Sequence, residues 1–137
     1  MPIPKDIKAI ILTPAIISTV AVLIAMIFPI INRSRPQYKV THEMSALIVA
    51  IDSYRGKFEK LPEKDSILRR LCGDNAEQIK FLEWPTESIG SHGQPIDQWG
   101  TDYQITLSTN RITIISAGKN KRFGDKDDIT KSKYSEK

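Results

Sequence analysis

Few side chains in this sequence are of the types that do chemistry. The two histidines lie in different settings: His42 falls within a helical pattern and His92 in a glycine-containing stretch. No nucleophile pattern accompanies either of them, although a general base must lie within hydrogen-bond reach of the proton that it removes. Asp127 and Asp128 offer two carboxylates, but adjacent residues in a loop seldom converge on one substrate atom. We therefore expect the chain not to be an enzyme.

Other binding chemistries find little support in the sequence. There is no glycine-rich phosphate loop, histidine-rich metal motif or nucleophile elbow, so no small-molecule substrate is expected. The single Cys72 can form neither an intramolecular disulfide nor a cysteine zinc site. The formal net charge is +4, but lysines and arginines are scattered among acids instead of forming a stripe with stacking aromatics. We expect no nucleic-acid partner.

The N-terminal region carries an uncharged run from Ala9 to Ile31, about 23 residues long, which is sufficient to cross a bilayer as a helix. A secretory signal would have a shorter apolar core and a small-residue cleavage site. Pro14 and Pro29 lie inside the run, where proline tends to kink a helix. The sequence predicts a transmembrane anchor over residues 1–32 in contact with membrane lipid. Basic residues on both flanks leave its orientation open.

A long amphipathic helix is expected directly after the anchor. Apolar residues recur there at steps of three and four, which marks one helical face. The helix should end near Leu61-Pro62, because the residue before a proline is pushed out of the helical region. The expected apolar face consists of Val40, Met44, Leu47, Ile48, Ile51, Tyr54 and Phe58.

Shorter elements are expected in the rest of the chain. A short helix should lie between Glu63 and Gly73, followed by a helical turn over residues 76–82 and a loop. Residues 103–107 and 111–117 alternate and are rich in β-branched side chains, which predicts a β-hairpin. Residues 131–137 are polar and charged, and we expect a disordered tail there.

Three stretches stand out, residues 48–62, 95–103 and 116–129, and the span from the first to the last makes up about three fifths of the chain. They resemble the major pseudopilin of type II secretion systems. The end of the long helix, from Ile48 to Pro62, is similar to the corresponding helix end of that family. The stretch Pro95-Ile-Asp-Gln-Trp-Gly-Thr-Asp-Tyr103 resembles the family's Pro-x-Asp-x-Trp-Gly-x-x-Tyr. Its Trp99-Gly100 pair permits a tight turn with an aromatic ring that a small sheet can bury. The residues that carry this fold motif, without performing chemistry, are Pro95, Asp97, Trp99, Gly100 and Tyr103.

The third stretch, from Ser116 to Ile129, resembles the calcium loop of the same family. The resemblance implies that Asn120, Asp125, Asp127 and Asp128 bind calcium, which takes six to eight oxygen ligands from side chains, carbonyls and water. The alternative is a solvated acidic turn held by Asx-type hydrogen bonds. Five cations crowd the three aspartates and lower the expected affinity for calcium: Lys119, Lys121, Arg122, Lys126 and Lys131.

The resemblance implies a pilin-like α+β fold in which a long N-terminal helix precedes a short helix, a loop and a small antiparallel sheet. The pseudopilin-like domain would span residues 33–130 and lie outside the inner membrane, in a periplasmic or extracellular space. It would associate with other pseudopilin subunits or secretion-system proteins in a filament that assists protein export. The apolar run contains no glutamate, and the family's basic leader is not recognisable before it. The alternative is therefore a non-polymerising, single-span membrane protein whose exported domain binds a partner.

Overall fold

The computed structural model describes residues 14–33 and 35–134, with side chains over residues 17–27 and 35–134. The chain divides into two compact units, Met1–Ser34 and Arg35–Lys137. The first 13 residues of the expected anchor lie outside the described residues. Helix α1, Pro14–Arg33, belongs to the first unit and begins at Pro14, so that only Pro29 of the two prolines falls in its interior. No helix within the described residues reaches the length and apolar character expected of a membrane span.

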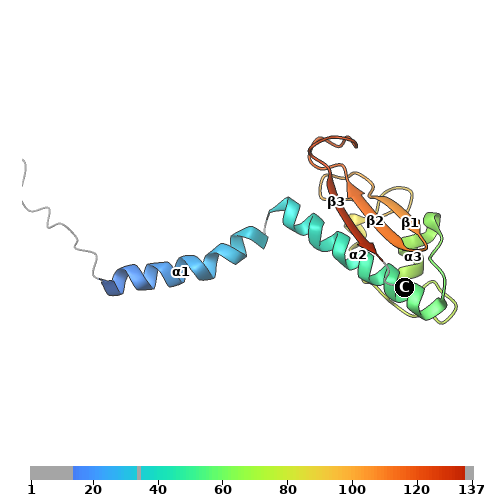
Figure 1. Ribbon diagram of the computed structural model, residues 1–137, viewed down its shortest axis with the longest axis horizontal. Coiled ribbons are helices and arrows are strands. Elements are labelled where there is room, and N and C mark those ends of the chain that lie inside the picture. The colour runs from blue at the N-terminus through green and yellow to red at the C-terminus, as the bar shows by residue number, and fades with distance from the viewer. Residues whose placement is uncertain (1–13, 34, 135–137) are drawn as a thin grey trace, which may run out of the picture. The chain divides into compact units, whose positions relative to one another are not determined.

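Helix α2, Pro36–Phe58, is the long helix that the apolar periodicity predicts (Figure 1). It starts with a proline at its first position, where a backbone N–H would have no acceptor within the helix. Every residue of the expected stripe is buried except Phe58, which packs partly buried against the core. The helix ends three residues before Leu61, because Glu59 adopts a left-handed conformation with φ of 55°.

The segment after α2 contains the expected short helix. It consists of the 3₁₀ turn η1, Lys64–Ser66, continued by α3, Ile67–Leu71, and a second 3₁₀ turn, η2, covers Thr86–Ser88. The helical turn expected over residues 76–82 is wrong. The buried Asn75 side chain instead donates to the carbonyl of Ile79 and accepts from its N–H, at 2.7 and 3.0 Å. Such side-chain bonds replace the backbone bonds that a helix would need.

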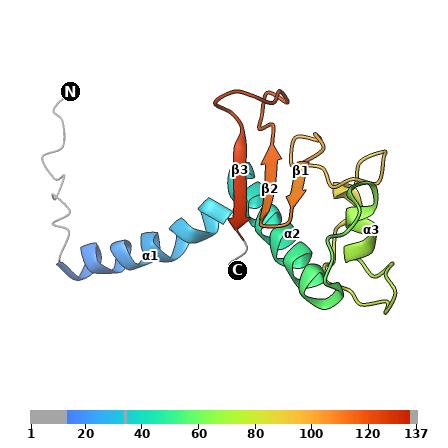
Figure 2. The same ribbon diagram turned by 45° about the vertical axis from the view of Figure 1, so that its right-hand side comes forward.

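Three antiparallel strands form the sheet, in the order β1-β2-β3 (Figure 2). They are β1, Gln104–Ser108, β2, Arg111–Ser116, and β3, Ile129–Tyr134. The first two form the expected hairpin, closed by the pair Ser108 and Arg111. Residues 131–134 complete β3 in place of the first part of the expected disordered tail, and residues 135–137 lie outside the described residues.

Strand β3 is polar because it is an edge strand that rests on the polar side of α2. Lys131 donates to the hydroxyl of Ser45, and Lys133 forms an ion pair with Asp52, both acceptors lying on α2. Lysines are common on edge strands because they discourage pairing with another chain. The apolar alternation that marks an inner strand is therefore missing here.

The core lies between α2 and the sheet, within the second unit. Ile105 of β1 and Ile112 and Ile114 of β2 are buried in one cluster with the apolar face of α2. The far end of α2 is covered by aromatic contacts, with the rings of Tyr54 and Phe58 4.7 Å apart. At the other end of α2, Gln37 lines a depression together with residues of the loop that joins β2 to β3.

Candidate functional site

The turn between Pro95 and Tyr103 is built around a buried carboxylate. Asp97 is only 4% exposed. Its Oδ1 accepts the backbone N–H groups of Trp99 and Thr101 at 2.9 and 3.0 Å, and Gly100 takes φ of 80°, which favours glycine. One aspartate thus holds the tight turn that the sequence motif predicts.

A second carboxylate fastens this turn to α2. Glu43 accepts the hydroxyl of Tyr103 at 2.8 Å and the side-chain amide of Gln98 at 2.9 Å. Burial of Tyr103, reinforced by the hydrogen bond to Glu43, raises the pKa of the tyrosine well above its usual range. Tyr103 therefore remains a neutral donor, and it joins segments that are 60 residues apart in sequence.

Ser116, at the end of β2, connects the turn to the loop that follows. Its hydroxyl donates to Asp97 Oδ2 at 2.6 Å and accepts the N–H of Gly118 at 3.2 Å. The position of Gly118 has no room for a side chain, since an added Cβ would lie 2.2 Å from the carbonyl oxygen of Asp127. Two of the three stretches that resemble the pseudopilin family, residues 95–103 and 116–129, are therefore joined directly by hydrogen bonds.

The residues from Gly118 to Asp128 form what we call the acidic loop. The Asn120 side chain donates to Asp125 Oδ2 at 2.6 Å and accepts the N–H of Arg122 at 2.9 Å. Asp125 Oδ1 accepts the N–H of Asp127 at 2.8 Å. These are Asx-type bonds, by which asparagine and aspartate side chains stabilise turns. The structure brings all four expected ligands into one loop.

A calcium ion would need these oxygens to converge. The loop, all of whose residues are described, offers one oxygen that is free to bind a cation, but its carboxylates are not grouped around one point. Asp128 Oδ2 accepts the N–H of Gly124 at 2.7 Å, whereas Asp128 Oδ1 is buried and has no hydrogen-bond partner. A buried carboxylate oxygen without a partner suits a cation. Over the described part of the chain, however, no three His, Cys, Asp or Glu side chains are grouped closely enough to hold a metal ion. The oxygen donors are of the type that calcium takes, and they are spread along the loop.

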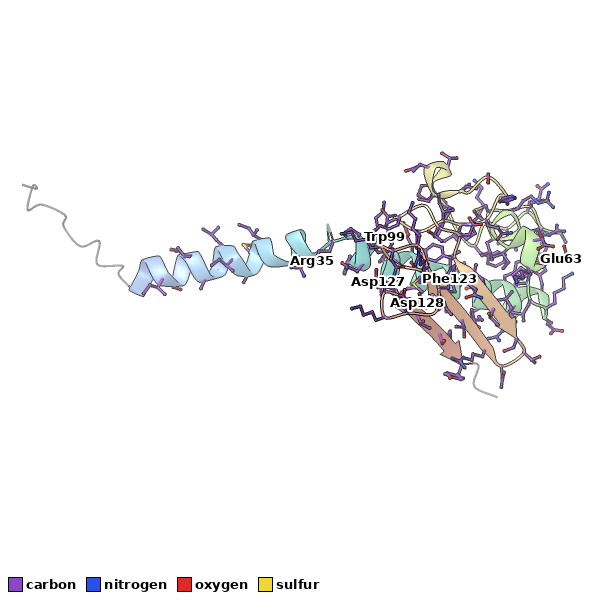
Figure 3. All side chains as sticks on the ribbon, turned by 90° about the horizontal axis from the view of Figure 1, so that it is seen from above. Arg35, Glu63, Trp99, Phe123, Asp127 and Asp128 are labelled. Atoms are coloured by element: carbon purple, nitrogen blue, oxygen red, sulfur yellow. The ribbon has the colours of Figure 1, made fainter. Side chains whose placement is uncertain are left out.

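The acidic loop lies next to the beginning of α2. A depression of about 280 Å³ is lined by Gln37 of α2, by Trp99, and by loop residues that include Lys119, Asp127 and Asp128. Figure 3 shows Trp99, Asp127 and Arg35 at the same end of the second unit, with Glu63 at the far end. The turn, the loop and the start of the long helix therefore share one end of the folded unit.

Sequence reasoning missed the residues that connect these parts, namely Glu43, Gln98 and Ser116. Glu43 is one of several polar residues beside the apolar stripe, and no spacing distinguishes it from its neighbours. Ser116 falls within the expected strand, where a serine gives no sign of a buried partner. The two histidines lie outside this arrangement: His42 is exposed on α2, and His92 is exposed in a turn where its Nδ1 lies 3.2 Å from the Ser91 hydroxyl.

No curated protein and no solved structure gives a significant match to the chain. One family model does match, that of type II secretion system protein G, over residues 30–132. This range includes α2, the Asp97 turn, the sheet and the acidic loop, and it confirms the resemblance expected from the sequence. The chain therefore belongs to the type II secretion system protein G family of pseudopilins.

Proposed function

We propose that the chain is a membrane-anchored structural subunit that assists protein export by assembling with other pseudopilins in a type II secretion system or a system related to type IV pili. The family match over residues 30–132 is the observation that carries this proposal. The internal bonds of the site support it as well. Asp97, Glu43 and Ser116 are engaged in holding backbone and side chains together, which suits a structural subunit.

The uncovered side of α2 is the surface that we propose for contact with a second subunit. Val49 is 60% exposed and Tyr38 is 45% exposed, and both lie on the side of α2 that the sheet leaves open. His42 and Ser53 lie on the same side of the helix and are also exposed. Each of the two apolar side chains is available for contact with another subunit, although they lie eleven residues apart.

The apolar run from Ala9 to Ile31 supplies the proposed anchor. Its length and lack of charge support a single crossing of the inner membrane. The family match supports placing the second unit on the exported side. The absence of an acidic residue from this run favours the alternative, in which an anchored domain binds a partner without polymerising.

A self-association experiment distinguishes the two functions. The full chain is reconstituted in bilayers and cross-linked at increasing protein density, alongside Val49→Arg and a matched Thr106→Arg, which places the same charge on an exposed position of β1. We expect ladders of cross-linked species for the unaltered chain and Thr106→Arg, and their loss in Val49→Arg. A chain that stays monomeric at every density would refute filament assembly and leave the non-polymerising function.

We also propose that the acidic loop binds calcium through Asn120, Asp125, Asp127 and Asp128. The partnerless Asp128 Oδ1 supports this, and so does the oxygen chemistry of the four residues. The bound ion would supply positive charge among the carboxylates, and the chain's part would be to draw them together. Binding at about a hundred times the dissociation constant should stabilise the folded state by about 2.7 kcal/mol.

Thermal unfolding with a chelator and then with calcium tests this second proposal. The unaltered chain should gain stability with calcium, whereas Asp128→Asn should not. Asp102→Asn is the matched control, because Asp102 is exposed and lies outside the loop. Equal shifts in both variants, or no shift in the unaltered chain, would leave the loop as an acidic turn held by its own hydrogen bonds.

A further inference from the structure

The end of the second unit where α2 begins carries an excess of positive charge. The acidic loop contributes four cations, the residue before α2 contributes one, and the first turn of α2 contributes another. All six side chains are exposed, and we call them the basic rim: Arg35, Lys39, Lys119, Lys121, Arg122 and Lys126.

Several observations place these cations together. Lys119 and Lys126 line the depression that also contains Gln37, which lies between Arg35 and Lys39 in the first turn of α2. Figure 3 shows Arg35 at the same end of the second unit as Asp127 and Asp128. Phe123 is half exposed but lines a different depression, beside Tyr103 and Ile105, and is not part of the rim.

The three aspartates of the loop do not neutralise the rim. Within the described residues no ion pair joins them to any rim cation. Their oxygens accept backbone N–H groups of the loop instead, as in the bonds from Asn120 to Asp127 and from Gly124 to Asp128 at 3.3 and 2.7 Å. Six cations against the three loop aspartates leave a net charge of +3 for the rim and the acidic loop. The other two carboxylates described at this end, Asp97 and Glu43, accept hydrogen bonds within the unit.

Chain connectivity limits how far the start of α2 can lie from the end of α1. Only three residue steps separate Arg33, the last residue of α1, from Pro36, the first of α2. Three extended residues span about 11 Å at most. This is close to the distance of about 10 Å over which charges interact at moderate ionic strength. The start of α2 is thus within electrostatic reach of the lipid headgroups if the apolar run crosses the bilayer.

We propose that the basic rim docks on anionic lipid headgroups of the membrane that holds the anchor, and so fixes the folded unit against the bilayer. The inference rests on the proposed anchoring and adds a lipid partner for the exported domain. Each cation near an anionic surface should change the docking equilibrium about fivefold, with an effect that declines as salt is added. Loss of four cations should weaken docking by two orders of magnitude or more.

The test uses the full chain in phosphatidylcholine vesicles with and without phosphatidylglycerol. A fluorescent probe is attached through Phe123→Cys in a Cys72→Ser background, and quenching by headgroup-labelled lipid reports how close the loop lies to the membrane. We expect strong quenching only in the anionic vesicles, and we expect high salt to reverse it. Equal quenching in both kinds of vesicle, or quenching that salt does not change, would overturn the proposal.

Two variants with the same change in net charge distinguish an effect of the rim cations from an effect of the total charge of the chain. In one, the loop cations Lys119, Lys121, Arg122 and Lys126 become glutamine. In the control, the exposed residues Lys57, Lys60, Lys64 and Lys80, outside the rim, become glutamine. Only the first should lose the anionic quenching, and equal loss in both would overturn the assignment of the rim.

Flotation of the same samples tests the anchor separately. A chain anchored by its apolar run floats with neutral vesicles whether or not the rim cations have been replaced. If the unaltered chain does not float with neutral vesicles, the anchor is refuted. In that case the proposal that the rim binds anionic lipid is supported if only the loop variant fails to float with anionic vesicles. It is refuted if the loop variant floats with them as well as the unaltered chain does.

Discussion

Replacing Asp97 by alanine tests whether one buried carboxylate holds the turn and the end of β2 together. The change removes three hydrogen bonds at once, those donated by the N–H groups of Trp99 and Thr101 to Oδ1 and by the hydroxyl of Ser116 to Oδ2. Ser116 is fully buried, so water cannot easily replace the lost acceptor there. The two N–H groups belong to half-buried residues and can regain water in part.

The size of the effect follows from these partners. Hydrogen bonds to charged groups contribute about 1.5–3 kcal/mol each, which gives a gross loss of about 4.5 kcal/mol at the lower end. Partial hydration of the turn and relief of the buried charge reduce this value, and we expect the free energy of unfolding to fall by about 3 kcal/mol. Asp97→Asn keeps the shape and the Oδ1 acceptor, and it should cost about 1 kcal/mol.

Urea unfolding of a fragment spanning residues 35–137, followed by tryptophan fluorescence and circular dichroism, provides the measurement. Asp102→Ala is the matched control, since Asp102 is an exposed aspartate of the same segment and should change stability by less than about 0.5 kcal/mol. If Asp97→Ala costs no more than Asp102→Ala, then Asp97 does not hold the turn and the reasoning is refuted.

Three further results are expected. Gly118→Ala should destabilise the unit by more than about 2 kcal/mol, because its Cβ would meet a backbone oxygen at 2.2 Å, whereas Gly93→Ala, with φ of 74° and open space around it, should cost about 1 kcal/mol in urea unfolding. Tyr103→Phe should leave the absorbance change of tyrosine ionisation up to about pH 11 unaltered, because burial keeps this hydroxyl protonated in the folded state. A reduced change would show that Tyr103 titrates normally. The Lys133 ammonium holds the pKa of Asp52 below its usual value, so this carboxylate stabilises the fold above about pH 4 and stops doing so as the pH falls. Acid unfolding of Asp52→Asn should therefore depend less steeply on pH, and an unchanged slope would contradict this.

The parts of the fold that bury apolar residues at a regular spacing could be predicted from the sequence. Helix α2 and the hairpin of β1 and β2 were found because their apolar residues recur with helical and strand periods and end in turn residues. Strand β3 was missed because Lys131 and Lys133 occupy positions that an inner strand would give to apolar residues. Their partners on α2, Ser45 and Asp52, become visible only in three dimensions.

The sequence predicted the candidate site as two separate stretches. It could not predict the hydrogen bonds that connect these stretches to each other and to α2. The residues of the turn motif, Pro95 to Tyr103, do form one turn, and the residues from Asn120 to Asp128 do form one loop. Ser116 and Glu43 join these stretches to each other and to α2 through hydrogen bonds that depend on the tertiary fold. Hydrogen bonds between distant residues leave no periodic pattern in a sequence.

The bond between Glu43 and Tyr103 has a consequence for how the protein is made. The ribosome completes α2 well before β1, and Tyr103 emerges 60 residues after Glu43. At about 5–20 residues per second, this separation corresponds to about 3–12 s. During this interval the apolar face of α2 has no sheet to cover it, and the newly made helix is exposed to aggregation and to chaperones. The domain completes its core only when β2 and the first residue of β3 have been synthesised.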